Sequence, residues 1–189
     1  MRYPFVLLLA GLGLLQGCVA PVVAAGVGAG MMMSAADRRS AGAMVEDDTI
    51  EGKSEKRINE KYKDTAHVSV TSYNRFALIT GTAASENAKM DIERIVGSIP
   101  NVKGIANEIV VGAAPASGTH SSDSYITSSV KTRFVKSKAL KADHVKVVTE
   151  GGVVYLMGLV TRAEADAASE IASTTKNVQK VVRVFEYID

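Results

Sequence analysis

The chain has 189 residues, of which 47% are hydrophobic and 22% charged, a balance typical of a globular protein with one domain or two small ones. Its formal net charge of +2 gives no electrostatic reason to expect nucleic-acid binding. A single cysteine excludes an intrachain disulfide and a zinc site built on several thiolates, so we expect no metal and no cofactor.

The N-terminus has the pattern of a secretory signal. A short basic start precedes an apolar run of about a dozen residues, which is too short to span a bilayer. The run ends in Leu-Gln-Gly-Cys at residues 15–18, which resembles the bacterial lipobox, where the thiol is acylated and the chain is cut just before it. We therefore expect residues 1–17 to be a signal peptide and Cys18 to be the lipidation site.

Residue 19 is Val rather than Asp. By the sorting rule of enterobacterial lipoproteins, this implies export to the outer membrane, with the lipid-anchored chain facing the periplasm. Residues 18–45 are rich in Ala, Gly, Val and Met without helical or strand periodicity, and they include a Gly-x-Gly-x-Gly run. No strand leads into that run, so the segment indicates a lipidated tether rather than a phosphate loop. A coil of this length reaches about 30 Å.

The rest of the chain contains one pattern twice. The matching segments are 67–71 with 144–148 and 76–81 with 153–158, both at an offset of 77, and 101–105 with 177–181 at an offset of 76. Residues 112–122 between the two copies have the composition of a linker. The sequence therefore predicts one domain at 46–111 and a second at 123–189.

Each copy predicts a helix, two strands, a helix and a strand. The first opens with a capping-box-like pair, Asp48 and Glu51, and Ser85 caps its second helix. In the second copy, Thr161 and Glu164 form a capping box. We expect an α+β fold in which each αββαβ unit packs a three-stranded mixed sheet on two helices.

Two glycines occupy matching positions. Gly81 and Gly158 each follow the apolar residues of the second strand of their copy. A glycine there indicates a bend, a positive φ or a close backbone approach, so both are predicted to be structural.

The αββαβ pattern resembles the BON domain. The shared features are a Val-x-Val strand, an apolar strand ending in Gly, and Asn-Val after the second helix. Residues 36–42 and 153–161 are, in addition, similar to outer-membrane lipoproteins with two BON domains. The resemblance covers nearly all of the mature chain and implies a non-catalytic protein that helps maintain envelope integrity.

The resemblance also implies partners. It implies that the second domain binds anionic phospholipids, phosphatidylglycerol or cardiolipin, through its first helix, with contacts at the positions of Tyr125 and Val135. The family has Trp where this chain has Tyr125, and Tyr inserts less apolar area. The resemblance further implies concentration at division sites and action near the outer-membrane β-barrel assembly machinery.

The distribution of charge agrees with a membrane contact in the second domain. Between Asp123 and Asp143 there is no acidic residue, and the spacing of Ile126, Val130 and Phe134 directs them to a core. Exposed apolar groups among cations are typical of a helix that binds an anionic membrane surface. The predicted phospholipid-binding residues are Tyr125, Val135, Lys131, Arg133, Lys136 and Lys138. A solvated charged face would explain the basic run about as well.

No catalytic motif occurs in the chain. His67 and His144 stand at matching positions before a strand, as expected of a duplicated structural element, and His120 lies in the predicted linker. We expect no enzyme. Two alternatives stay open: a protein-binding adaptor that uses the acidic first domain and its open sheet edge, and a soluble periplasmic chaperone, which Cys18 opposes. The apolar periods leave open whether the two domains pack together.

Overall fold

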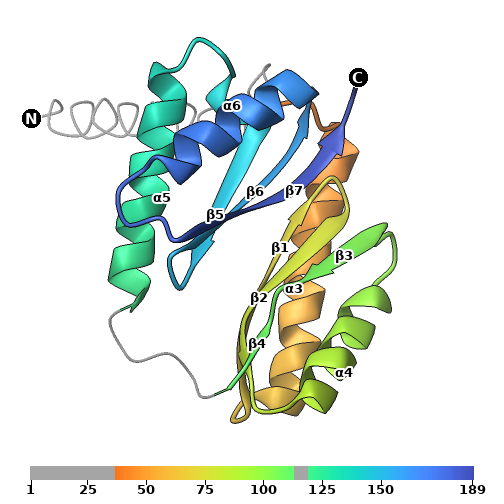
Figure 1. The fold of residues 1–189 in the computed structure, drawn as a ribbon. Helices are drawn as coiled ribbons and strands as arrows, with labels where there is room; N and C mark the ends of the chain where they lie inside the picture. Colours follow the sequence, from red (N-terminus) through yellow and green to blue (C-terminus); the bar gives the residue numbers. More distant parts are fainter. Residues whose placement is uncertain (1–36, 113–118) are drawn as a thin grey trace, which may run out of the picture. The chain divides into compact units, whose positions relative to one another are not determined.

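The computed structural model describes residues 37–112 and 119–189, so the predicted signal peptide, Cys18 and most of the tether lie outside the described residues. Within them the chain repeats helix, strand, strand, helix, strand, as Figure 1 shows. The predicted α+β fold class is confirmed.

The first domain is built on one mixed sheet. Its elements are α3 (Ala41–Tyr62), β1 (Ala66–Tyr73), β2 (Phe76–Ala83), α4 (Glu86–Gly97), β3 (Gly104–Asn107) and β4 (Val110–Val111). β1 pairs antiparallel with β2, and β3 and the two-residue β4 both pair parallel with β2. β3 and β4 therefore act as one interrupted third strand.

α3 begins earlier than the sequence analysis predicted. Its N-cap is Ser40, whose hydroxyl accepts a hydrogen bond from the Ala43 amide at 3.1 Å. The predicted start at Asp48 and Glu51 is wrong because these residues lie inside the helix, where Glu51 accepts a hydrogen bond from the Ser72 amide of β1 at 2.7 Å.

The second domain repeats the arrangement. Its elements are α5 (Thr119–Lys136), the short 3-10 helix η2 (Ala142–His144), β5 (Val145–Glu150), β6 (Val153–Val160), α6 (Arg162–Ser173) and β7 (Lys180–Tyr187). β6 pairs antiparallel with β5 and parallel with β7. The predicted capping box at the start of α6 is present, and α5 starts within the segment predicted to be a linker.

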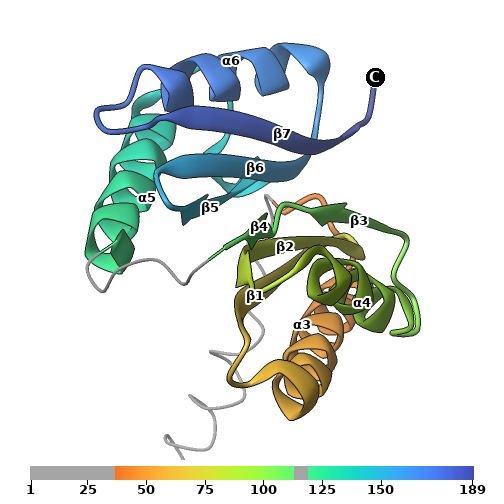
Figure 2. The same cartoon turned by 60° about the horizontal axis from the view of Figure 1, so that its bottom comes forward.

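Each sheet carries its two helices on one face, as Figures 1 and 2 show. In the first domain Ile50, Ile79 and Ile92 are fully buried in this helix-covered core. In the second, Val130 and Leu156 are buried in the same way. The core of the second domain includes Ile126, Val130 and Phe134, whose helical spacing predicted their burial.

A third apolar cluster joins the two domains. It contains Tyr73 and Leu78 of the first sheet and Tyr155, Met157 and Leu159 of the second. Because successive side chains of a strand point to opposite faces, Tyr155 and Met157 lie on the face of β6 opposite Leu156, away from the helices. The domains therefore pack sheet against sheet.

Candidate membrane-binding surface

Two buried aspartates fix the first helix of each domain to its hairpin. The Asp47 carboxylate accepts hydrogen bonds from the amides of Asn74 and Arg75 at 2.8 and 2.6 Å. In the second domain the Asp123 carboxylate accepts from the amides at 151 and 152, both at 2.8 Å. All four turn residues have positive φ, so their amides converge on one acceptor.

These aspartates hold each first helix, α3 and α5, in place on its sheet. Sequence reasoning missed both, although they stand 76 residues apart at matching positions of the repeat. In the sequence, an acidic residue in the first two turns of a helix cannot be distinguished from a solvated charge, because the turn that it binds is far away along the chain.

Gly81 and Gly158 mark where two backbones touch. A Cβ at Gly81 would clash with the carbonyl oxygen of His67, and one at Gly158 with the carbonyl oxygen of His144. Gly81 also has a φ of 112°. The histidine positions matched in the repeat thus contribute their carbonyl groups to this contact.

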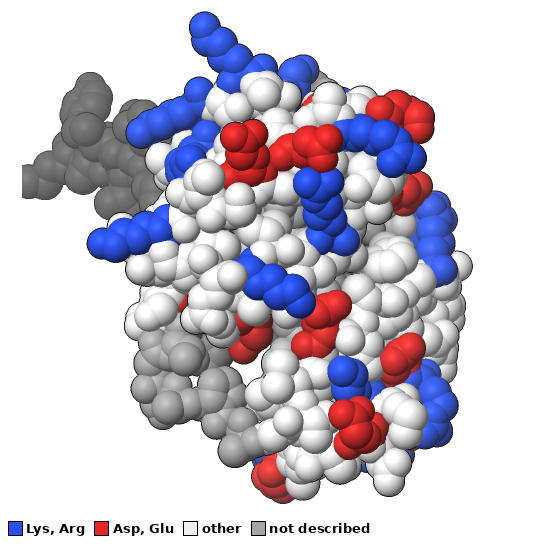
Figure 3. Space-filling view, viewed as in Figure 1, with Lys and Arg blue, Asp and Glu red and all other residues white. Residues whose placement is uncertain are grey.

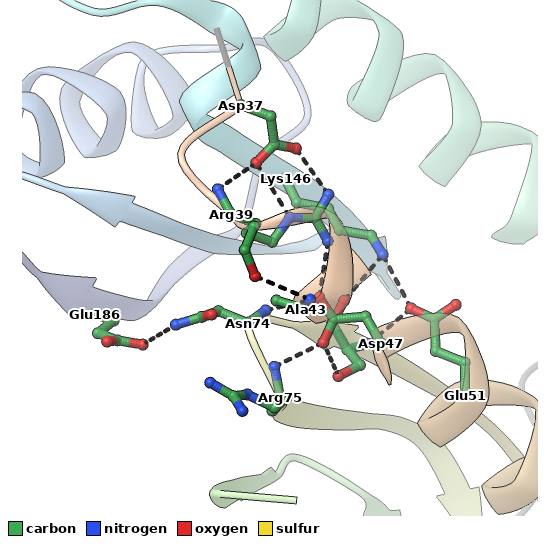
Figure 4. Close-up of polar contacts among 11 residues, drawn as sticks. Asp37, Arg39, Ala43, Asp47, Glu51, Asn74, Arg75, Lys146 and Glu186 are labelled. Carbon is green, nitrogen blue, oxygen red and sulfur yellow. Dashed lines mark hydrogen bonds and ion pairs between the residues drawn. The ribbon is translucent and has the colours of Figure 1, made fainter. Parts of the chain in front are cut away.

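Residues 37–39, which we call the strap, bind both domains. Arg38 Nη1 donates to the Leu159 carbonyl at 2.8 Å and to Glu164 Oε2 at 2.7 Å, while its Nη2 donates to Glu164 Oε1 at 3.0 Å. Arg39 donates hydrogen bonds to Asp37 and Asp47, each at 2.9 Å (Figure 4). Its guanidinium also lies over the Tyr73 ring, 4.2 Å from the ring centroid. Arg38 therefore holds the second domain and Arg39 the first.

Two further side chains, Lys146 and Asn74, make polar contacts between the domains, as Figure 4 shows. Lys146 Nζ donates to Glu51 Oε1 at 3.0 Å and to the Ser72 carbonyl at 3.2 Å. Asn74 Nδ2 donates to Glu186 Oε2 at 2.7 Å. With the strap, these contacts border the third apolar cluster and set the register of the two sheets.

Glu164 links the strap to α6. Burial alone raises the pKa of its carboxyl, but hydrogen bonds from Arg38, the Thr161 amide and His144 outweigh burial and lower the pKa to about 2. The buried His144 ring lies with Nδ1 3.0 Å from Glu164 Oε1. The carboxylate is thus charged at neutral pH. It closes the capping box of α6 and also binds Arg38 of the strap.

α5 presents two large apolar side chains to solvent. Tyr125 is 59% exposed and Val135 is 73% exposed, whereas Ile126, Val130 and Phe134 are buried as the spacing predicted. Ten residues of helix separate Tyr125 from Val135, which corresponds to about 15 Å along the axis. Both therefore lie on the solvent side of one helix.

Hydroxyl side chains fill the space between them. Ser128 and Thr132 complete an i, i+3, i+7, i+10 stripe from Tyr125 to Val135. The Ser128 hydroxyl donates to the Ser124 carbonyl at 2.9 Å, and the Thr132 hydroxyl donates to the Ser128 carbonyl at 2.8 Å. Because these donors are bonded within the helix, moving the stripe toward an apolar phase costs less than it would with free hydroxyls.

Basic side chains border the stripe. Lys131, Lys136 and Lys138 are exposed, and Figure 3 shows Lys and Arg gathered over the end of α5 at the upper left of the view. Asp37 of the strap lines the same hollow of about 360 Å³ as Lys131 and Val135. The described chain thus begins beside the exposed surface of α5.

Arg133 has a different environment from the lysines. It is half-buried, and Nη1 donates to the Ile171 carbonyl and the Thr175 hydroxyl, both at 2.6 Å. Nη2 donates to the Thr174 hydroxyl at 2.9 Å. The guanidinium therefore caps the C-terminal end of α6, where a cation is favoured. It also lines a shallow hollow of about 510 Å³ that extends to Tyr125.

Two features are absent from the described parts of the chain. Residues 37–112 and 119–189 contain no group of three or more His, Cys, Asp or Glu side chains arranged to hold a metal ion. None of their helices is long and apolar enough to cross a membrane. The predicted lipidation site Cys18 and the side chain of His120 lie outside what the structure describes.

Comparison with known proteins identifies the family. The BON-domain model matches residues 46–113 and 122–189, so the chain belongs to the BON-domain family. It is 34% identical, over 93% of its length and 91% of the relative's, to a Haemophilus influenzae protein named outer membrane lipoprotein DolP. It is also 34% identical to the 21 kDa hemolysin of Actinobacillus pleuropneumoniae, over 80% of this chain and 79% of that one. The predicted resemblance to dual-BON lipoproteins is confirmed.

One solved structure is a distant match. CdsD, a structural protein of the type III secretion system of Chlamydia trachomatis, aligns with 77% of this chain and 92% of its own at a TM-score of 0.30 and 11% identity. That likeness is too weak to carry an argument.

Proposed function

We propose that the protein is an outer-membrane lipoprotein, anchored at Cys18 and facing the periplasm, that binds anionic phospholipids through α5 and helps maintain envelope integrity without catalysis. The name of the Haemophilus relative, outer membrane lipoprotein DolP, supports the location. The observation that carries the lipid-binding function is the uncharged, exposed stripe from Tyr125 to Val135 between lysines.

A membrane explains this surface better than solvent alone. Solvation accounts for Lys131 and Lys136, but it gives no reason for two large apolar groups on the same side of the helix. An interfacial helix needs both features, since apolar groups enter the headgroup boundary while cations meet anionic phosphates. The hydrogen-bonded hydroxyls of Ser128 and Thr132 support the same conclusion.

The expected affinity of α5 alone is low. Each basic residue near an anionic surface contributes about 1 kcal/mol, so Lys131, Lys136 and Lys138 together give about 3 kcal/mol before losses. A millimolar dissociation constant corresponds to about 4 kcal/mol. Arg133 contributes less than the sequence analysis expected, because its guanidinium is bonded to the end of α6.

The lipid anchor makes such weak binding effective. Tethering raises the concentration of α5 at the membrane surface. Asp37 lies in the same hollow as Lys131 and Val135, which supports engagement of one membrane by both the acyl chains and α5. On the basis of the family resemblance, we also propose that the protein concentrates at division sites and acts near the outer-membrane β-barrel assembly machinery.

Co-sedimentation with vesicles tests the proposal. The protein used is residues 37–189, because a start at residue 46 would remove the strap and the first turn of α3. We expect vesicles with phosphatidylglycerol or cardiolipin to pull it down and neutral vesicles to leave it in solution. Tyr125→Glu and Val135→Glu are each expected to weaken binding at least fivefold.

The matched control is Val45→Glu. Val45 is 66% exposed on α3 of the first domain, so the substitution adds the same charge at a similar exposure away from α5. It is expected to bind like wild type. Equal losses for Val45→Glu and Val135→Glu, or no sedimentation of wild type, would refute lipid binding through α5.

A further inference from the structure

A cavity of about 460 Å³ opens beside the contact between the two domains. One wall is formed by five successive residues of β7, 182–186, and the opposite wall by Phe76, Lys103, Ala106 and Glu108 of the first domain. Tyr73, Val182 and Val184 also belong to the third apolar cluster. The cavity is therefore a continuation of the interdomain interface toward solvent.

The β7 wall is a strand edge. Successive side chains of a strand point to opposite faces, so a wall that takes five residues in a row includes the edge of the strand as well as one face. β7 is the last strand of its sheet and pairs only with β6 among the described residues. Along its eight residues, the backbone groups that point away from β6 have no strand partner among the described residues, and such an edge is a template for another strand.

The charges at the cavity are balanced rather than cationic. Arg183 is paired with Asp166 at 2.7 Å, and Glu186 accepts a hydrogen bond from Asn74 at 2.7 Å. Lys103 and Glu108, which flank β3, add one positive and one negative charge to the cavity lining. A lipid phosphate would need an excess of cations, and an acyl chain would leave the backbone edge unpaired.

We propose that the outer edge of β7 and the adjoining cavity bind an extended peptide segment of a partner protein by strand addition. The segment would have apolar side chains at alternate positions. Its backbone pairs with β7, its apolar side chains enter the cavity toward Phe76 and Ala106, and Lys103 and Glu108 select charges at its ends. This interaction is independent of lipid binding, because none of these residues lies on α5.

Fluorescence anisotropy tests the proposal with residues 37–189 and a labelled nonapeptide in which Val alternates with Thr between a terminal Lys and a terminal Glu. We expect saturable binding. A second peptide, N-methylated at alternate backbone positions, keeps the side chains but cannot pair as a strand, and it should bind at least tenfold more weakly. Binding of the two peptides within twofold of each other would overturn strand addition, as would no binding up to millimolar concentration.

Two variants test the location. Ala106→Phe fills the cavity from the first domain and should weaken binding at least tenfold, while Lys103→Glu changes one exposed charge without touching a core and should weaken it severalfold. Met90→Glu, at an exposed position on α4, is the control and should bind like wild type. Unchanged binding by both Ala106→Phe and Lys103→Glu would place the peptide elsewhere.

A final comparison distinguishes a partner peptide from this chain's own N-terminal segment as the occupant of the cavity. If residues 19–189 bind the peptide as well as residues 37–189 do, the site is open to a partner. If the longer chain no longer binds it, the occupant is this chain's own N-terminal segment and the proposed partner is excluded.

Discussion

At the scale of single residues, a few positions determine where α5 lies. Asp123 joins the start of α5 to the hairpin of its sheet, and Gly158 lets η2 approach β6 closely. The glycines could be predicted from the sequence, because a glycine at the end of an apolar strand has few structural explanations. The aspartates could not, because their partners are amides in turns about 28 residues away, and nothing in the local pattern distinguishes them from solvated charges.

Alanine at either glycine is expected to destabilise the fold. The added Cβ of Gly81→Ala or Gly158→Ala would clash with a backbone carbonyl, which cannot move aside like a flexible side chain. We expect urea denaturation to show a loss of about 1–3 kcal/mol for each variant, and more at Gly81 because of its positive φ.

The control for the glycine prediction is Gly52→Ala. Gly52 is exposed within α3, and an added Cβ there meets nothing within 4 Å. Because alanine favours helix, this variant should gain up to about 1 kcal/mol. Equal stability of Gly52→Ala and Gly158→Ala would show that close backbone approach is not what the matched glycines provide.

At the scale of elements, the strap and the start of α6 form one unit. Glu164 closes the capping box with Thr161 and binds Arg38 of the strap. The capping box could be predicted because its two residues are three apart. The pair with Arg38 could not, because 126 residues separate the partners and leave no periodic signal. The predicted start of α3 was wrong for a related reason, since Glu51, which binds the Ser72 amide of β1, resembles a capping residue in the sequence.

The Glu164 contacts predict a dependence of stability on pH. The carboxyl pKa is about 2 in the folded protein, against an ordinary value of 4.5, so its stabilising effect is complete above about pH 4.5 and is lost as the pH falls toward 2. Glu164→Gln should therefore lower the melting temperature most at pH 6–7, by the equivalent of roughly 2 kcal/mol, and progressively less below pH 4.5.

Glu170→Gln on the same helix is the comparison for pH. Its side chain is exposed, and this variant should melt close to wild type at every pH. If the stability that Glu164→Gln loses relative to wild type stays constant from pH 7 to pH 3, the stabilising contact with Arg38 does not depend on the ionised carboxylate, and the account is contradicted.

At the scale of the whole molecule, the interdomain cluster makes one folded unit of two repeats. β6 is apolar at nearly every position from Val153 to Val160, and such continuous hydrophobicity is typical of a strand buried on both faces. That signal was present in the sequence, although helical and strand periods alone did not identify what covers the second face. The repeat, the helices and the strand order could be predicted from the sequence, because each domain's helix-covered core is formed by residues of one continuous segment of the chain.

Met157→Lys is expected to separate the domains without unfolding them. Met157 is buried in the interdomain cluster, while Leu156 serves the helix-covered core of its own domain. We expect a loss of about 2–4 kcal/mol, a larger radius of gyration by small-angle scattering and two melting transitions in place of one. Met90→Lys, at an exposed position on α4, should leave the scattering unchanged. Unchanged scattering for Met157→Lys would argue against sheet-to-sheet packing.

The measurement that tests the central claim most directly is the fluorescence of a Tyr125→Trp variant. The chain contains no Trp, so the new side chain is the single indole reporter, placed at the end of the exposed stripe. We predict that its emission shifts to the blue with vesicles containing phosphatidylglycerol or cardiolipin and stays unchanged with neutral vesicles. Val45→Trp on the first domain should not respond. If Tyr125→Trp keeps its water-exposed emission with anionic vesicles, or if Val45→Trp shifts equally, α5 is not the membrane-binding surface.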